Sequence, residues 1–303
     1  MAGVLAFRLP GPAPLRTTLG ILVALGALAG LWRLRGWRGP TWFAALFALV
    51  LGGFLALRPS QHRDWWPDVA RIPTFQFHGA GLTVHNLRNG SCETGERTEA
   101  RYETRHYDLR NLQGMDLFLI SWGSPHIAHT ILSFDFGAGE HLAFSFETRK
   151  ERHEAFSSLK GFFREYELCV VAGTEEDLIG IRVNHRREQV RLYRLNTPPD
   201  VARAIFIDTA ERANGLALKP QWYNALTENC TTAMVGPVRR RSGRLPWSWK
   251  LILSGHVDEL IYDCGIIDRS LPFAEVRRRA LIHGQAQIAA KGPDFSRRIR
   301  EGR

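Results

Sequence analysis

The sequence predicts an α+β protein in which two apolar helices precede a unit built on an antiparallel sheet. Two nearly uncharged apolar runs lie within the first 60 residues. After them come short segments that alternate polar and apolar residues, which is the period of a half-buried strand, and the period becomes helical only near residue 197. The chain is therefore expected to divide into a helical hairpin over residues 1–60 and a second unit over residues 61–303.

The two apolar runs cover about residues 17–34 and 41–57. Each is at the short end of the roughly 17–25 residues that cross a bilayer as a helix. Arg8 and Arg16 precede the first run, as in a secretory signal peptide, but no small-residue cleavage site follows and the second run begins at once. The pair is therefore interpreted as a transmembrane hairpin.

The turn between the runs carries Arg33, Arg35 and Arg38. Lys and Arg are enriched in cytoplasmic loops, so this turn is expected in the cytoplasm and the long remainder on the outer side of the membrane. Tryptophans flank both runs, where their indole rings favour the headgroup layer. The pattern predicts a multi-pass anchor that carries an external domain.

The second unit, of about 240 residues, is long enough for one sizeable hydrophobic core. It begins with strand-like segments, and a glycine-containing link at 137–140 suits an antiparallel hairpin. The predicted strands are 75–87, 101–109, 115–123, 126–137, 141–149, 164–173, 179–185 and 189–195.

The helical period follows the strands. Thr197 is expected to cap a helix over residues 197–218, because prolines stand just inside its start and apolar residues recur at helical spacing. A second helix is expected to begin at Cys230 and to stop near residues 236–237, where a Gly-Pro pair stands. Residues 273–290 are predicted to be helical as well.

The net charge of +10 and the isoelectric point near 9.9 suit either nucleic acid or an anionic membrane surface. Basic residues concentrate in residues 238–244, 276–280 and the basic C-terminal tail 296–303. No RNA-binding motif with interleaved aromatic residues and no helix-turn-helix pattern is found. With a membrane hairpin present, attraction to anionic lipid is the simpler explanation, and no nucleic-acid partner is expected. A solvated basic surface would have the same composition.

The four cysteines have no CxxC or Cys/His spacing, so neither a metal site nor a cofactor is expected. Cys92 could pair with Cys169 or Cys264, because the external side of a membrane permits disulfides. Spacing alone does not decide the pairing. Cys169 lies in an apolar run and is interpreted as a core residue.

Cys230 stands in the segment NALTENCTTAMV, which reads as the start of a helix. The positive end of a helix favours the thiolate, which is the form that attacks carbonyl carbon. A buried structural cysteine is the commoner alternative. A nucleophilic role for Cys230 therefore requires a base elsewhere in the chain.

His129 is the best candidate for that base. It lies in the middle of an apolar predicted strand, and the next predicted strand carries Ser145 and Glu147 on one face. A carboxylate across the hairpin would orient the ring and support its cationic form. His126 lies on the opposite strand face and competes less well. The order histidine, glutamate, cysteine reverses that of papain and points to circularly permuted papain-like folds.

Several separated motifs occur in one collinear run over about residues 63–270. They are RDWWPDVARIP, AHTILSFDFG, FETRKE, LKGFFREYEL, GIRVNHR, VRLYRL and WYNALTENCTT. This run resembles the periplasmic domain of the bacterial lipoprotein N-acyltransferase family Lnb. The resemblance implies a circularly permuted papain-like (NlpC/P60-like) domain over residues 61–303, on the periplasmic side of the inner membrane.

The resemblance also implies an activity. It is a thiol acyltransferase that moves an acyl chain from a membrane phospholipid to the amino-terminal cysteine of a diacylated lipoprotein. His129 matches the AHT motif and Cys230 the NCTT motif, while Glu147 and Arg149 lie in FETRKE.

Other residues are assigned to substrate from their chemistry. The N–H of Cys230 and the Asn229 amide are expected to stabilise an oxyanion, and Arg149 and Arg164 are candidates for holding a phosphate. The segment 244–255, with Trp247 and Trp249, fits either a membrane-surface element or a core strand.

Two other functions remain open at this stage. A cysteine peptidase or amidase acting on cell-wall peptides needs the same Cys-His pair, with water as the second nucleophile. A membrane-anchored binding module could keep the fold without catalysis.

Overall fold

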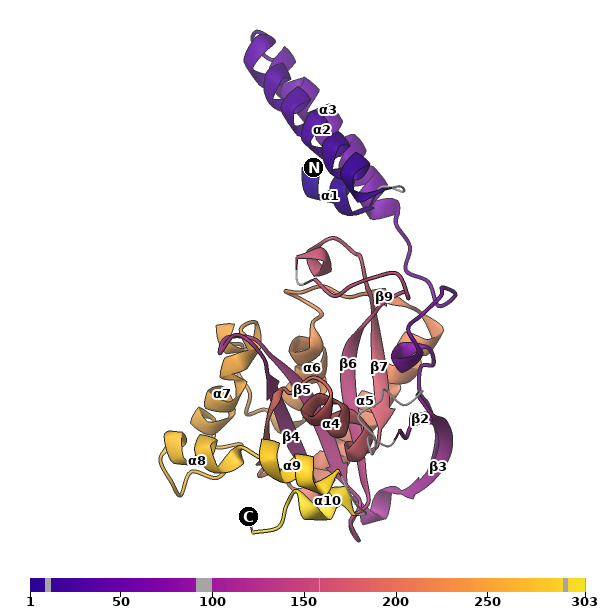
Figure 1. The fold of residues 1–303 in the computed structure, drawn as a ribbon, viewed down its shortest axis with the longest axis vertical. Helices are drawn as coiled ribbons and strands as arrows, with labels where there is room; N and C mark the ends of the chain where they lie inside the picture. Colours follow the sequence, from indigo (N-terminus) through magenta and orange to yellow (C-terminus); the bar gives the residue numbers. More distant parts are fainter. Residues whose placement is uncertain (9–11, 91–99, 158, 291–293, 303) are drawn as a thin grey trace.

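The structure is a computed structural model that describes residues 1–8, 12–90, 100–157, 159–290 and 294–302. Two long apolar helices, α2 (Ala13–Arg33) and α3 (Arg38–Ala56), form a hairpin that projects from one end of the sheet-containing part of the chain (Figure 1). Both are long and apolar enough to cross a membrane. A short helix, α1 (Ala2–Arg8), packs against them and was not predicted. The two predicted apolar helices are confirmed.

Nine strands in the described residues form one sheet below the hairpin (Figure 1). The order is β1-β2-β7-β6-β5-β4-β8, with β3 paired to β2 and β9 to β7. All pairs are antiparallel apart from one parallel contact, between β2 and β7. The predicted α+β class with an antiparallel sheet is thus confirmed. The strands are β1 (Thr74–His78), β2 (Gly81–Arg88), β3 (Tyr102–Asp108), β4 (Gly114–Ser121), β5 (Ala128–Asp135), β6 (His141–Arg149), β7 (Glu167–Gly173), β8 (Gln189–Arg194) and β9 (Gln221–Trp222).

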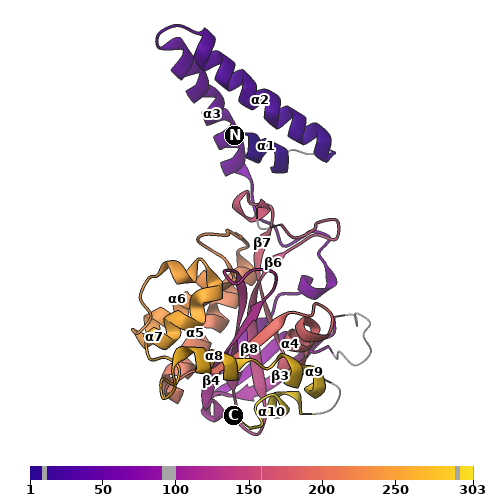
Figure 2. The ribbon, with the colours of Figure 1, turned by 60° about the vertical axis from the view of Figure 1, so that its left-hand side comes forward.

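Helices cover both faces of the sheet (Figure 2). One face packs against α5, α6 and α7, and the other packs against α4, α9 and α10. Apolar residues alternate along the central strands to face one layer or the other, so the sheet is buried on both sides. The helices are α4 (Glu175–Asn184), α5 (Pro199–Leu218), α6 (Cys230–Ser242), α7 (Val257–Asp263), α8 (Phe273–Ala280), α9 (His283–Ala289) and α10 (Phe295–Arg298).

The larger core is organised around Phe206 of α5. Its fully buried ring meets the rings of Phe75, Phe134, Phe136 and Phe144 edge-on, with centroids 5.1–6.3 Å apart. Edge-to-face pairs add to the free energy gained by burying the rings. This contact holds α5 against the middle of the sheet.

One predicted strand is wrong. Residues 179–185 lie in helix α4. The helix forms because the Thr174 side chain accepts a hydrogen bond from the Asp177 N–H, and because three acidic residues occupy the positive first turn. These local signals outweigh the β-branched residues that suggested a strand.

The helix ends also differ from prediction. Helix α6 continues through Pro237 to Ser242 and ends at Gly243, which has φ of 63°. Helix α5 is preceded by Pro198, and Thr197 lies one residue outside this cap position. The predicted helix over residues 273–290 is divided into α8 and α9, because Leu281 pairs with Arg191 of β8.

The segment between α3 and β1 packs on one end of the sheet. The indole N–H of Trp65 donates to the Gln61 carbonyl at 2.9 Å, and the backbone N–H of Trp66 donates to the Lys150 carbonyl at 3.0 Å. The guanidinium of Arg149 lies 4.4 Å from the centre of the Trp65 ring. The carboxyl end of β6 therefore faces the membrane hairpin.

Replacing Phe206 by alanine tests the aromatic core. The change leaves a cavity among four rings and should lower the free energy of unfolding by about 3–5 kcal/mol, which lowers the melting midpoint by about 10 °C for a domain of this size. Phe156→Ala, at a ring that is 50% exposed, is the control and should change the free energy by about 0.5 kcal/mol or less. Equal effects in melting curves of the detergent-solubilised chain would contradict this account of the core.

Candidate active site

The candidate site lies where β5 and β6 separate. Their pairing ends at Ile131 opposite Ser145, although β5 stays paired with β4 as far as Ala128 and β6 stays paired with β7 as far as Arg149. The first residues of β5 and the last residues of β6 thus face each other without ladder hydrogen bonds. The opening leaves room for polar side chains inside a sheet whose central strands are largely apolar on both faces.

His129 fills this opening. Its Nε2 lies 2.6 Å from the Ser145 hydroxyl and 3.2 Å from a carboxylate oxygen of Glu147. The Ser145 hydroxyl donates to the same Glu147 oxygen at 2.6 Å, so it accepts from a proton on Nε2. In this tautomer Nδ1 carries the lone pair and is available as a base.

Arg182 of α4 holds the carboxylate from the other side. Its Nη2 donates to Glu147 Oε1 at 2.7 Å, and its Nη1 donates to Glu188 at 3.2 Å. The Arg182 side chain is nearly buried, and such a charge requires partners of opposite sign. Arg182 therefore keeps Glu147 ionised and directed toward His129.

Cys230 reaches the same opening as the first residue of α6. Asn229 is the N-cap: its side-chain oxygen accepts from the N–H groups of Thr231 and Thr232 at 2.9 and 2.8 Å. The Thr232 hydroxyl accepts from the Asn229 N–H at 2.9 Å and completes a capping box. The Cys230 sulfur lies 3.9 Å from the carbonyl oxygen of Ala128, the residue before His129.

The charges of these groups support one another. Burial opposes ionisation of the Cys230 thiol, but the charge of the adjacent His129 ring lowers the pKa of the thiol below its ordinary value. Burial and the Arg182 charge oppose protonation of His129, yet Glu147 and Cys230 raise the pKa of the imidazole. Burial would raise the pKa of Glu147, but His129 and Arg182 hold it well below its usual range. The arrangement favours a thiolate beside an imidazolium.

The start of α6 also offers a hydrogen-bond donor. Asn229 satisfies the N–H groups of Thr231 and Thr232 with its side chain and that of Ala233 with its carbonyl. Within the described residues, the N–H of Cys230 makes no hydrogen bond. It can therefore donate to an oxyanion that forms beside the sulfur. The Asn229 amide instead serves the helix start, since its Nδ2 donates to the Ala225 carbonyl at 3.0 Å.

The structure places Arg149 and Arg164 outside this group. Arg149 is buried and donates to the carbonyls of Val69 and Ala70 at 2.9 and 2.7 Å, as well as to Gln61. Arg164 donates to the Phe54 carbonyl at 3.0 Å, at the end of α3. Arg149 thus holds the segment between α3 and β1 against the domain, and Arg164 contacts the end of α3 itself.

Sequence reasoning missed Arg182 and gave Ser145 no role. The sequence feature that could have revealed Arg182 is the helix cap formed by Thr174 and Asp177. It places residues 175–184 on a helix, which packs on the face of the sheet opposite α6. The pairing of Arg182 with Glu147 spans 35 residues and has no signature in the sequence.

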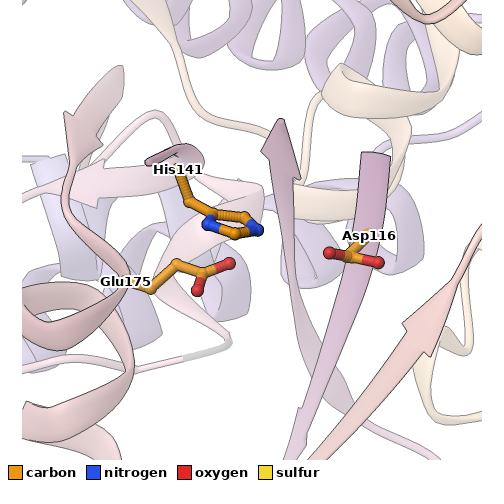
Figure 3. A group of neighbouring side chains, drawn as sticks. All are labelled: Asp116, His141 and Glu175. Atoms are coloured by element: carbon orange, nitrogen blue, oxygen red, sulfur yellow. The ribbon is translucent and has the colours of Figure 1, made fainter. Parts of the chain in front are cut away.

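A second polar cluster lies in the structure, built from Asp116, His141 and Glu175 (Figure 3). Their potential ligand atoms lie within 4.8 Å of one another, as in a metal site. The Arg300 guanidinium, however, already lies among them, donating at 2.6 Å to each carboxylate. Burial would raise the pKa of Glu175, but Arg300 lowers it to about 2. The cluster is thus a buried ion pair that fixes the C-terminal segment.

The remaining sequence predictions have mixed outcomes. Cys169 is buried, as predicted, and Cys169 and Cys264 are free thiols, while Cys92 lies outside the described residues. Trp247 and Trp249 are 60% and 55% exposed, and residues 249–251 form a short 3-10 helix instead of a strand.

The model of one protein family, the Lnb N-terminal periplasmic domain, matches residues 98–255. The match covers more than half of the chain and contains the whole His129, Glu147 and Cys230 group. The chain belongs to the Lnb family. No curated protein and no solved structure matches it.

Membership in the Lnb family confirms the resemblance seen in the sequence. Together with helices α2 and α3, it indicates a membrane-anchored protein with a periplasmic domain. It is consistent with an enzyme that modifies lipoproteins.

The pH dependence of Cys230 alkylation tests the electrostatics of the site. Iodoacetamide reacts with the thiolate, so the reaction rate rises as the pH passes through the thiol pKa. The midpoint for Cys230 should lie below the ordinary value of 9.0. In His129→Ala it should lie above 9.0, because burial then acts without the imidazole. Cys264, whose pKa is raised by burial, is the internal control and should not respond. The midpoints are read by residue-resolved mass spectrometry. Equal Cys230 midpoints in both proteins would contradict an ion pair between Cys230 and His129.

Replacing Arg300 by alanine tests the second cluster. Glu175 would lose its arginine partner and Asp116 would keep only a 3.5 Å contact with the half-exposed Arg194, which should lower the free energy of unfolding by about 3–5 kcal/mol. The control is Arg297→Ala in helix α10, just before Arg300, where the ion pairs are more than half exposed and contribute about 1 kcal/mol or less. Urea denaturation followed by tryptophan fluorescence measures both variants. A metal site masked by Arg300 would instead give a variant that divalent cations restabilise.

Proposed function

We propose that this chain is a membrane-anchored thiol acyltransferase that takes an acyl chain from a phospholipid and passes it to an amine. The observation that carries the proposal is the position of His129, which lies 3.2 Å from Glu147 and directly follows Ala128, whose carbonyl oxygen lies 3.9 Å from the Cys230 sulfur. A nucleophile, a base and an orienting carboxylate are the parts that acyl transfer through a thioester requires. A circularly permuted papain-like domain is part of the same proposal.

The first step forms the thioester. The Cys230 thiolate attacks the carbonyl carbon of a phospholipid ester, and the Cys230 N–H donates to the developing oxyanion. The C–S bond forms, the C–O bond of the ester breaks, and the His129 imidazolium gives its proton to the departing glycerol oxygen. The products are an acyl-enzyme and a lysophospholipid.

The second step transfers the acyl chain. The amino group of the acceptor, proposed to be the amino-terminal cysteine of a diacylated lipoprotein, attacks the thioester carbonyl. An amide bond forms, the C–S bond breaks, and His129 accepts the proton released by the amine. Glu147 stabilises the imidazolium in both steps, and Arg182 holds Glu147 in place.

The position of the site near the hairpin favours a lipid over a cell-wall peptide. The loop before Cys230 contacts residues 160–162, since the Ala225 N–H donates to the Gly161 carbonyl at 3.3 Å. The ring of the neighbouring Phe163 packs at a tilt against Phe7 of α1, with ring centroids 5.1 Å apart. Large apolar side chains are exposed on the connection between β6 and β7, at Phe156, Leu159 and Phe162. A surface of this kind suits contact with membrane lipid.

Incubation of the detergent-solubilised chain with phospholipid tests the first step. Intact-mass spectrometry should show an adduct of one acyl chain that hydroxylamine removes. The adduct should be absent from Cys230→Ser and His129→Ala, and its formation should slow about 10- to 100-fold in Glu147→Gln, because the amide holds the ring without stabilising its charge. Cys264→Ser is the control and should behave as the parent. Absence of both adduct and lysophospholipid from the parent protein would exclude the proposal.

A further inference from the structure

A cavity of about 240 Å³ lies next to the candidate site, on the face of the sheet that carries α6. It is formed by the end of β4, the loop between β4 and β5, the start of β8, the short 3-10 helix Ser254–His256 and α8; strands β4 and β8 and helix α8 lie close together in the fold (Figure 2). Ala128 lines the cavity, and its carbonyl oxygen lies 3.9 Å from the Cys230 sulfur. A ligand in this cavity would therefore lie beside the nucleophile.

Arg191 of β8 places a positive charge at the cavity. Its Nη1 makes one long contact of 3.4 Å with the Ser121 hydroxyl, and its Nε is buried without a hydrogen bond. Among the described residues, no carboxylate lies within ion-pair distance of this half-buried guanidinium. A partly buried arginine that lacks an anionic partner is energetically costly and calls for an explanation.

Three other arginines with buried or partly buried side chains have the counter-charge that Arg191 lacks, whereas the buried Arg149 is satisfied by the oxygens of Val69, Ala70 and Gln61. Arg88 pairs with Asp177 at 2.7 Å, Arg182 pairs with two glutamates, and Arg300 pairs with Asp116 and Glu175. Each has its counter-charge inside the fold.

Arg277 is the second cation at the cavity, and its charge is already matched. Its Nε lies 3.1 Å from the fully buried Asp258, which also accepts from the Tyr193 hydroxyl at 2.8 Å. No carboxylate lines the cavity in the described part of the chain, whereas the hydroxyls of Ser121 and Ser124 do. The cavity thus presents an excess positive charge with neutral hydrogen-bond donors around it.

We propose that this cavity is a phosphate-binding site centred on Arg191, which holds the phosphodiester of the phospholipid while its ester is presented to Cys230. The assignment to lipid rests on the proposed function. The planar fork of arginine suits bidentate contact with phosphate oxygens. The volume is below the roughly 300–1,000 Å³ of pockets that enclose drug-sized ligands, so a headgroup fits and the acyl chains stay outside.

The test compares substrates with and without phosphate. Full-length protein in non-ionic detergent is given a phospholipid or a diacylglycerol with the same acyl chains, and release of the monoacyl product is measured. Arg191→Gln should lower kcat/KM for phospholipid about 10- to 100-fold, as expected for loss of a charge-assisted contact, and leave that for diacylglycerol unchanged. Arg278→Gln, an exposed residue of the same helix as Arg277, is the charge-matched control and should leave both unchanged.

A short-chain p-nitrophenyl ester separates this inference from the proposed function. If the parent protein cleaves neither this ester nor either lipid, the acyltransferase proposal fails. If it cleaves them and Arg191→Gln lowers all rates equally, Arg191 is not a headgroup residue and the inference is overturned. A melting midpoint of Arg191→Gln well below that of the parent would likewise overturn it, because an unpaired charge should cost stability when no ligand is bound.

Competition with inorganic phosphate distinguishes a cavity that binds a lipid headgroup from one that binds free phosphate. Under the proposal, millimolar phosphate competes with phospholipid in the parent and does not compete in Arg191→Gln. The opposite outcome has two parts: phosphate raises the melting midpoint of the parent but not of Arg191→Gln, and Arg191→Gln prefers phospholipid to diacylglycerol as strongly as the parent does. In that case the cavity binds free phosphate. That result would overturn the headgroup assignment.

Discussion

The end of the β5–β6 ladder at Ile131 and Ser145 is the constraint on which the candidate site depends. Beyond this pair the two strands no longer pair with each other, which leaves space between them for polar side chains. His129 and Glu147 occupy that space, and the sheet on either side remains paired and rigid. A rigid frame around a local opening fixes catalytic groups more closely than a loop would.

Charge balance explains why several helices must pack before the site exists. Glu147 is shared between His129 from β5 and Arg182 from α4, and each contact keeps the carboxylate ionised despite its burial. The thiol of Cys230 depends in turn on the imidazole and on the capped start of α6. Each charged group is tolerated because its neighbour carries the opposite charge. The site therefore forms only when the two layers of helices are in place on the sheet.

The same reasoning about buried charge separates structural arginines from a functional one. Arg149 and Arg164 seemed suited to phosphate, yet the structure uses them on backbone carbonyls near the membrane hairpin. Arg300 neutralises two carboxylates at the other cluster. Arg191 differs because it faces a cavity beside Cys230 without a carboxylate partner in the described residues. Partner contacts, and not residue type, distinguish these roles.

The sequence by itself determined the elements and their chemistry: two apolar helices, a series of strands, a capped helix that begins at Cys230, and His129 and Glu147 on successive strands. These features depend on residues a few positions apart, so period and capping are enough to find them. Only the tertiary structure decided where β5 and β6 separate, that Arg182 holds Glu147 across 35 residues, and that Arg300 meets Glu175 across 125. Such contacts form only when segments distant in sequence pack around a common core, so they cannot be predicted from the neighbouring residues in the sequence.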